Sequence, residues 1–243
     1  MRHAKLKQFV EQNLLNGQSP EAIAGRIRYR EKSLPVVSKD TVYRFLRSPY
    51  GQTIGLLLKK KKRPKGRRKA HKLSDRVFID KRPKIIEKRM RVGDAEADFI
   101  VSGRGGKGAL LGVVDRKLRV VFLEIIHRVT IDETHNAFVK IKNRFPEMRT
   151  ASIDNDLLFQ MHKTLEKLLD VRIYFCHPYH SWEKGSIENV NKAIRKFIPK
   201  GSSLAHYSRD EVQTVEDFLN DRYLKCLRYA TPREKLKKYR DRK

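Results

Sequence analysis

Apolar residues recur at helical spacing near the start of the chain, which predicts a helix from His3 to Leu15. Gly17 follows the last periodic position, where glycine commonly ends a helix. Ser19 then offers an N-cap with Pro20 at the first helical position, so a second helix begins there. The first two elements are therefore expected to be short helices separated by a tight turn.

A third helix is predicted over residues 39–47, because Ser38 provides another N-cap and Val42 and Phe45 share an apolar face. The rest of this helix presents basic and hydroxyl side chains, which suit the major groove of DNA and its flanking phosphates. We therefore predict a helix-turn-helix DNA-binding domain over residues 1–50. The alternative is a helical hairpin that only packs on the rest of the chain. The candidate DNA-binding residues are Lys39, Thr41, Tyr43, Arg44 and Arg47.

Strand-like apolar segments dominate the C-terminal part of the chain. The first three are separated by short turns, which predicts an antiparallel meander, and the later ones alternate with helical patterns. Three strands followed by helix, strand, helix, strand and helix is the element order of the ribonuclease-H-like fold, an α/β (α+β) architecture. The expected strands cover residues 95–101, 109–114, 120–127, 151–153 and 171–176, and the expected helices 130–145, 157–169 and 186–197.

Charge changes the interpretation of both parts. The 243 residues include 56 Lys and Arg against 28 Asp and Glu, a formal net charge of +28. Such an excess predicts a polyanionic partner, and nucleic acid is the natural one. The chain has no apolar run of membrane-spanning length and no secretory signal, so we expect no membrane association. Two cysteines, Cys176 and Cys226, exclude a disulfide scaffold and fit a cytoplasmic location.

The densest basic run covers residues 59–72, in which ten of fourteen positions are Lys or Arg. Proline, glycine and charge repulsion make it a poor helix or strand, so we interpret residues 51–82 as a linker that can lie on phosphates. The alternative is a solvated tether without defined contacts. The remaining residues, 83–243, form the expected second domain. The candidate DNA-binding residues of the linker are Lys59, Lys60, Lys61, Lys62, Arg63, Arg67 and Arg68.

Three acidic residues in or beside the expected core elements need a reason in so basic a chain. Asp98 lies inside the first strand, Asp154 ends the fourth, and Glu188 opens the last helix of the predicted fold. The first and fourth strands are neighbours in this fold, so the two aspartates are expected side by side. Carboxylates brought together repel one another unless a cation neutralises them, and oxygen ligands favour Mg²⁺ or Mn²⁺. Two such ions could serve phosphodiester chemistry. The alternative is that each carboxylate pairs separately with a surface Lys or Arg.

The spacing and surroundings of these acids resemble the Asp-Asp-Glu (DDE) triad of bacterial transposases, with 33 residues between Asp154 and Glu188. The most specific match is the stretch from Tyr174 to Asn191, where a strand, a proline-containing loop, a tryptophan, a basic residue and Gly-Ser precede Glu-Asn-Val-Asn. This is similar to the insertion-sequence-thirty family of transposases. The segments 17–26 and 227–234 also resemble that family, so the resemblance covers nearly the whole chain.

The resemblance implies a site in which Asp98, Asp154 and Glu188 hold two Mg²⁺ or Mn²⁺ ions. It further implies cleavage at element ends, strand transfer into target DNA, and a homo-oligomer working on double-stranded DNA with terminal inverted repeats in the bacterial nucleoid. Further DNA-binding candidates follow on and before the last helix of the fold, which has one apolar stripe and a separate polar face. These are Lys184, Asn191, Lys192 and Arg195.

Some positions depart from the family pattern. An aromatic residue is missing before Asp98, and after Asp154 neither the usual Gly nor the usual acidic residue stands at the expected place. The family usually carries another helix-turn-helix before the one found here. A truncated or inactivated transposase that acts only as a sequence-specific DNA-binding protein is therefore the alternative function. A nuclease of the same fold and a basic ribosome-associated protein are the other two. Cys176, His177 and His180 only weakly resemble a zinc-binding spacing, so we expect a loop there.

Overall fold

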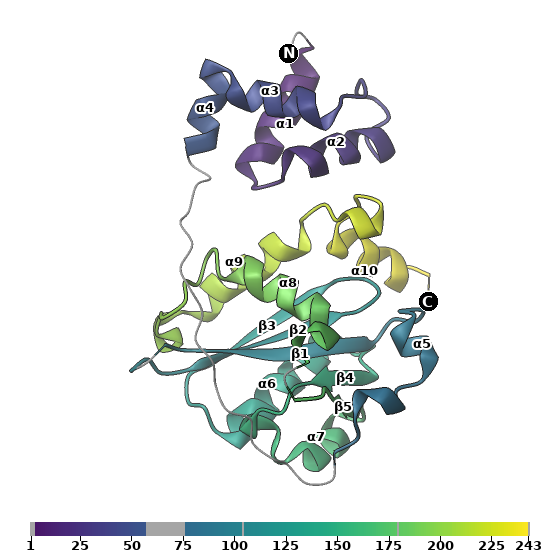
Figure 1. Ribbon diagram of the computed structural model, residues 1–243, viewed down its shortest axis with the longest axis vertical. Helices are drawn as coiled ribbons and strands as arrows, with labels where there is room; N and C mark the ends of the chain where they lie inside the picture. Colours follow the sequence, from purple (N-terminus) through teal and green to yellow (C-terminus); the bar gives the residue numbers. More distant parts are fainter. Residues whose placement is uncertain (1–2, 57–75, 104, 179, 243) are drawn as a thin grey trace. The chain divides into compact units, whose positions relative to one another are not determined.

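A computed structural model describes residues 3–56, 76–103, 105–178 and 180–242. The chain divides into two compact units, of which one combines Met1–Lys65 with Asp221–Lys243 and the other spans Gly66–Asn220 (Figure 1). This division differs from the one expected from the sequence, which placed residues 221–243 with the second domain. The predicted basic linker residues, Lys59, Lys60, Lys61, Lys62, Arg63, Arg67 and Arg68, lie outside the described residues.

The first unit begins with four helices, and the three predicted from the sequence are confirmed. They are α1 (Ala4–Leu15), α2 (Pro20–Tyr29) and α3 (Lys39–Arg47), with α4 (Pro49–Leu56) following directly. Ser19 and Ser38 cap α2 and α3 as expected, each accepting a backbone N–H at 3.2 Å. Helix α4 was not predicted, because its two glycines lower helix propensity.

These four helices enclose a small apolar core. Val10, Leu14, Ile23 and Val42 are completely buried in it, and Phe45 of α3 joins them. Val42 and Phe45 of α3 lie in this core and Leu46 packs against it, whereas Lys39, Tyr43, Arg44 and Arg47 are exposed. The helix is thus held by one face and presents the other.

The second unit is built on a five-stranded mixed sheet with the order β3-β2-β1-β4-β5. β2 is antiparallel to both β1 and β3, whereas β4 is parallel to β1 and β5 is parallel to β4. The expected strands are confirmed, and no boundary differs by more than one residue. They are β1 (Asp94–Val101), β2 (Ala109–Asp115), β3 (Val121–Ile126), β4 (Thr150–Ile153) and β5 (Arg172–Phe175).

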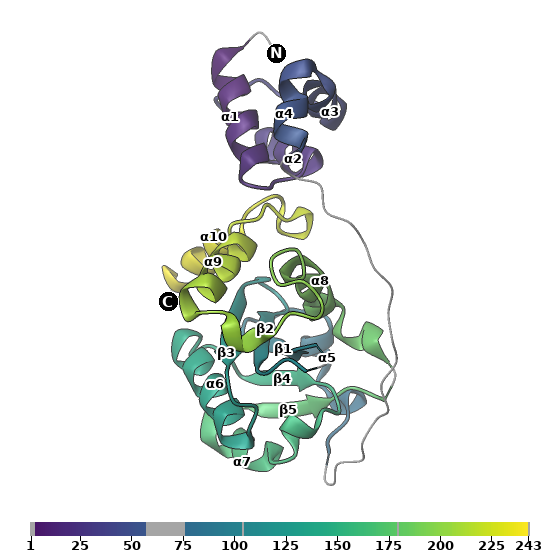
Figure 2. The same ribbon diagram turned by 90° about the vertical axis from the view of Figure 1, so that its left-hand side faces the viewer.

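Helices cover both faces of this sheet (Figures 1 and 2). Figure 1 shows α6 (Ile131–Arg144) and α7 (His162–Leu169) on one face, and α8 (Gly185–Ile194) and α9 (Arg209–Asn220) on the other. The helix predicted over 157–169 is interrupted, with a 3-10 turn at Leu157–Phe159 before α7. The short α5 (Lys84–Glu87) and the C-terminal α10 (Pro232–Arg240) were not predicted. No helix among the described residues is long and apolar enough to cross a membrane.

The two faces have cores of different character. Aliphatic residues fill the space beneath α8 and α9, among them Leu110, Ile187 and Ile194. Aromatic rings fill the α6 face, where Phe138 packs edge-on against Phe99 of β1 and also contacts Phe159. Residues 98 and 99 thus face opposite sides, as the alternation of a strand requires.

The edge strand β3 is closed by side chains of α9. Asn220 accepts a hydrogen bond from the backbone N–H of Val121 at 2.8 Å and donates one to the carbonyl of the same residue at 2.8 Å. Glu216 accepts the N–H of Leu123 at 2.5 Å. These side chains replace a sixth strand, so the edge has no free hydrogen-bonding groups at these positions.

Replacing Asn220 with Ala should lower the free energy of unfolding by about 2–4 kcal/mol, since two buried backbone groups of Val121 lose their partners. Chemical denaturation followed by circular dichroism measures this change. The control is Thr214→Ala on the exposed side of α9, which should change stability by less than about 1 kcal/mol. Equal effects of the two substitutions would contradict the role of Asn220.

Candidate active site

The register of the sheet brings Asp98 and Asp154 together. Glu96 of β1 lies beside Ser152 of the parallel strand β4. Two residues further along each chain, the same register sets Asp98 next to Asp154, which follows the last residue of β4. Alternation along β1 places Asp98 on the same face as Glu96, and this is the face that α8 covers.

Lys184, the residue before α8, joins the two aspartates directly. Its Nζ lies 3.0 Å from Asp98 Oδ1 and 3.5 Å from Asp154 Oδ2. The Lys184 side chain is only 6% exposed, whereas that of Asp154 is 44% exposed. Lys184 was expected among the DNA-contacting residues. The structure instead buries its ammonium between the two carboxylates, where it offsets their mutual repulsion.

A second contact comes from α8 itself. Asn191 donates a hydrogen bond from Nδ2 to Asp98 Oδ2 at 2.7 Å. Lys184, Glu188 and Asn191 are spaced by four and three residues, so they share one side of the helix. Glu188 therefore lies between the two residues that hold Asp98. The Glu188 carboxylate makes no hydrogen bond or ion pair with the described residues and is partly exposed.

The charges at this site shift the pKa of two groups. Burial raises the pKa of Asp98, the Lys184 ammonium lowers it and Asp154 raises it again, leaving the pKa above its usual range. Burial lowers the pKa of Lys184, but the two aspartates outweigh this effect and leave the pKa raised. Lys184 therefore stays charged at neutral pH, while the environment of Asp98 favours any added positive charge.

Glu96 holds α8 against the sheet from within the core. One of its carboxylate oxygens accepts the backbone N–H groups of Ser186 at 2.9 Å and Ile187 at 3.0 Å. The other oxygen accepts a hydrogen bond from Arg116 at 2.9 Å. Glu96 is fully buried, and Arg116 is 5% exposed. The carboxylate satisfies N–H groups that have no partner within the first turn of a helix and complements the helix dipole.

The absence of a side chain at Gly112 lets α8 approach the sheet closely. Gly112 of β2 pairs with Asp98 in the antiparallel register. A Cβ atom there would lie 3.3 Å from Ile187 Cδ1, so even alanine would crowd the helix. The beginning of α8 is therefore set by Glu96 and by this close contact.

Two buried oxygens at the site, Asp154 Oδ1 and Asn191 Oδ1, have no hydrogen-bond partner among the described residues. Unpaired buried oxygens are costly. These two atoms and the carboxylate oxygens of Asp98 are all oxygen donors in type. Mg²⁺ and Mn²⁺ prefer such donors. The residues present thus fit a hard divalent cation.

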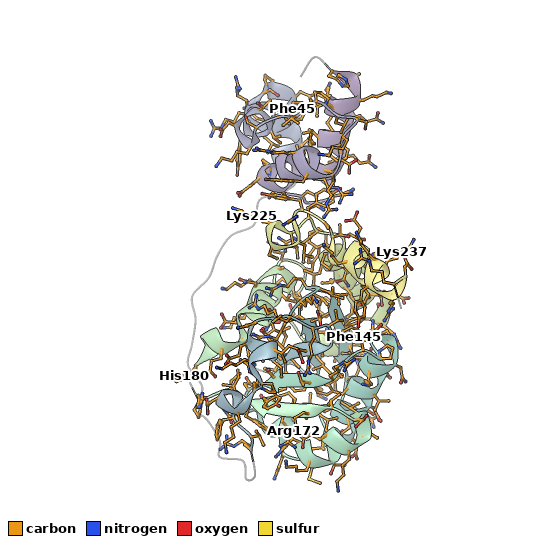
Figure 3. All side chains as sticks on the ribbon, turned by 90° about the vertical axis from the view of Figure 1, so that its right-hand side faces the viewer. Phe45, Phe145, Arg172, His180, Lys225 and Lys237 are labelled. Carbon is orange, nitrogen blue, oxygen red and sulfur yellow. The ribbon has the colours of Figure 1, made fainter. Side chains whose placement is uncertain are left out.

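A different group of side chains lies before α8. Among the described residues, His177, His180 and Glu183 form the one set of at least three histidine, cysteine or acidic side chains whose ligand atoms all lie within 4.8 Å of each other. Asp98, Asp154 and Glu188 do not form such a set. The Nδ1 atoms of His177 and His180 lie 2.9 and 3.4 Å from Glu183 Oε1, so hydrogen bonding accounts for the cluster. His180 is labelled in Figure 3.

The other candidate DNA-binding residues lie in two places. On α3, Lys39, Tyr43, Arg44 and Arg47 are exposed, while Thr41 is half-buried with its hydroxyl 3.1 Å from that of Ser38. On α8 and just after it, Lys192 is exposed and Arg195 is half-buried, donating a hydrogen bond to the carbonyl of Pro199 at 3.3 Å. Burial lowers the pKa of Arg195.

Comparison with known proteins decides the family. The chain is 36% identical over 234 residues to the transposase for insertion sequence element IS4351 of Bacteroides fragilis. The matching region covers 92% of this chain and 70% of that relative. The chain belongs to the insertion-sequence-thirty (IS30) family of transposases. It is 29% identical over 227 residues to the IS1086 transposase of Cupriavidus metallidurans, covering 88% of this chain and 67% of that relative.

A third relative agrees with this assignment. The transposase is 28% identical over 246 residues to InsI of element IS30C from Escherichia coli, covering 94% of this chain and 63% of that relative. The chain thus spans about two thirds of the length of these relatives. No family model matches it. The resemblance inferred from the sequence motifs is confirmed.

Glu96 of this transposase was not among the residues predicted from the sequence. Its position two residues before Asp98 in a strand was a usable signal, because both side chains must then face the same helix. The spacing of Lys184, Glu188 and Asn191 was a second signal for a shared helix face. Arg116 carried no local signal, since only the tertiary fold brings it to Glu96.

Replacing Glu96 with Gln should destabilise the transposase by about 3–5 kcal/mol, because the buried Arg116 loses its counter-charge. The amide protons of Ser186 and Ile187 should also exchange faster, since they lose a charged acceptor. Hydrogen exchange and denaturation measure the two effects. Adding Arg116→Met should recover part of the stability. A single variant as stable as the parent chain would refute the anchoring role.

Proposed function

We propose that this transposase cleaves DNA at the ends of its element and transfers the freed strand to target DNA, using Asp98, Asp154 and Glu188 as a DDE triad. The observation that carries the proposal is the adjacency of Asp98 and Asp154 around Lys184, beneath the helix that bears Glu188. Two carboxylates on neighbouring strands and a third on the covering helix suit phosphodiester chemistry with divalent metal ions.

The fold supports this assignment. The sheet order β3-β2-β1-β4-β5, with three antiparallel strands followed by two parallel ones, is the order expected of the ribonuclease-H-like core. The central strand β1 carries Asp98, and its parallel neighbour β4 leads to Asp154. We therefore propose a ribonuclease-H-like catalytic domain.

Asp98, Asp154 and Glu188 would hold two Mg²⁺ or Mn²⁺ ions. Bound there, such ions supply Lewis-acid activation of water and stabilise the charge that develops on the leaving oxygen. Asn191 orients the Asp98 carboxylate through its hydrogen bond. Lys184 keeps the two aspartates close before substrate arrives, because its ammonium contacts both. The partly exposed Glu188 carboxylate is left available by its lack of other partners.

The helical unit would recognise double-stranded DNA at the terminal inverted repeats. The exposed face of α3 carries Lys39, Tyr43, Arg44 and Arg47, while Val42 and Phe45 fix the helix to its core. A helix held in this manner can enter the major groove with its basic side chains outward. A transposase that acts on two paired element ends would do so as a homo-oligomer on DNA, within the nucleoid.

A DNA-binding regulator without cleavage activity is the second candidate. The observation that favours it is the ion pairing of Lys184, which compensates Asp98 and Asp154 without any metal. This function needs α3 and the basic surface but not the carboxylates. The triad variants below separate the two functions.

Asp98→Asn, Asp154→Asn and Glu188→Gln should each reduce cleavage of duplexes taken from the DNA that flanks the gene at least about 1,000-fold, equivalent to about 4 kcal/mol. Binding of the same duplexes should persist, because the triad lies outside the helical unit. Cleavage assays with Mg²⁺ and with Mn²⁺ measure the loss. Asp132→Asn, an exposed neutralisation in the first turn of α6, is the control and should retain activity.

If the parent protein cleaves the duplex and the Glu188→Gln variant cleaves it equally well, the assignment of Glu188 to the triad is refuted. A parent protein that binds the duplex but never cleaves it, with all variants binding alike, would establish the regulator instead.

Arg44→Ala should weaken binding to element-end DNA by about 1–3 kcal/mol, since it removes one charged contact from the exposed face of α3. Fluorescence anisotropy at fixed salt measures the change. Lys167→Ala on α7 removes the same charge elsewhere and should have little effect. Equal losses in both variants would show that net charge alone is responsible.

A further inference from the structure

The C-terminal segment folds against α2 within the first unit. Gln18, just before α2, donates a hydrogen bond to the carbonyl of Asp221 at 2.9 Å and accepts the N–H of Tyr223 at 3.1 Å. The rings of Tyr29 and Tyr229 stack with centroids 5.8 Å apart. Residues about 200 positions apart in the sequence therefore form one surface.

Arg26 of α2 pairs with two carboxylates of this region. It pairs with Glu31 at 2.8 Å and with Glu234 at 2.8 Å, and its guanidinium lies 4.7 Å from the centre of the Tyr223 ring. Glu234 also forms a capping box with Thr231 at the start of α10. Glu31 and Glu234 thus both pair with Arg26, and Glu234 also caps α10.

Five other cations of this surface form no ion pair with a described residue. Arg30 donates a hydrogen bond to the carbonyl of Arg228 at 3.3 Å, so the two guanidinium-bearing residues are neighbours. Arg228 lies in the left-handed region (φ 52°) of a turn closed by the Leu224–Ala230 bridge. No ion pair with a described residue involves the five cations that we define as the tail surface: Arg30, Arg228, Lys235, Lys238 and Arg242.

These cations act on one another. Partial burial lowers the pKa of Lys235, and the charges of Arg30, Lys238, Arg228 and Arg242 lower it further, in that order. Four of the five side chains are exposed, and Lys235 is half-buried among them. Like charges concentrated in this manner cost free energy unless an anion neutralises them. Figure 3 labels Lys225 and Lys237, two further lysines of the same segment.

We propose that the tail surface binds the sugar–phosphate backbone of double-stranded DNA. It carries charge without a base-reading helix, so it fits phosphates independently of sequence, beside the specific contacts assigned to α3. The inference rests on the proposed DNA-binding function and adds a second binding site to it. The C-terminal segment then contributes to the DNA-binding unit rather than only ending the chain.

The test is the salt dependence of binding by the full chain to a duplex of random sequence. Each phosphate contact contributes about 0.9 to the slope of log affinity against log salt concentration. The triple variant Lys235→Gln, Lys238→Gln, Arg242→Gln should therefore lower the magnitude of that slope by about 2–3. Arg228→Gln alone should lower it by about 1 and serves if the triple variant fails to fold.

The matched control is Lys163→Gln, Lys167→Gln, Arg172→Gln, which removes three exposed positive charges around α7 and β5; Arg172 is labelled in Figure 3. It should leave the slope within about 0.5 of that of the parent chain. Equal slopes in the tail variants and the parent chain, or equal changes in tail variants and control, would overturn the inference. Failure of the parent chain to bind any duplex would instead overturn the proposed function.

Discussion

The buried carboxylate of Glu96 is the contact on which the geometry of the site depends. It receives the first N–H groups of α8 and the guanidinium of Arg116 in a space closed to solvent. A helix terminus buried without such an acceptor would be costly, so the position of α8 on β1 is strongly determined. Helix α8 carries Glu188 and Asn191, so the contact with Glu96 also sets the distance of these two residues from Asp98. Asp98 lies two residues after Glu96 in the same strand.

Backbone geometry does the remaining positioning. The parallel register of β1 and β4 aligns Asp98 with Asp154, and the glycine opposite Asp98 in β2 admits α8 at close range. A shift of β1 by one residue would turn Glu96 and Asp98 to the aromatic face beneath α6 and bring Phe99 under α8. The paired arrangement of an anchoring carboxylate and a site carboxylate, two residues apart, therefore requires this register.

The sequence predicted the parts of this molecule that local rules control. Serine caps defined α2 and α3, apolar segments defined the five strands, and helical spacing put Glu188 and Asn191 on one face. It did not predict α10, whose apolar content is small and whose Glu234 pairs with Arg26 of α2. It also placed Lys184 on DNA, because a lysine beside a helix has no local signal of burial; only the fold surrounds it with two aspartates.

The pairing of charges distinguishes the carboxylates of the site from the other buried carboxylates of this basic chain. The buried carboxylates away from the site are each satisfied locally: Asp94 by Arg91, Glu124 by Lys140 and Arg144, and Asp115 by three backbone N–H groups. Asp98 and Asp154 share a single ammonium instead, with Glu188 unpaired nearby on the covering helix. In a protein with a formal charge of +28 there is no shortage of lysine or arginine to complete such pairs. The excess of carboxylates over cations is therefore a local property of the site. Under the proposed function, it is this property that would attract a divalent cation.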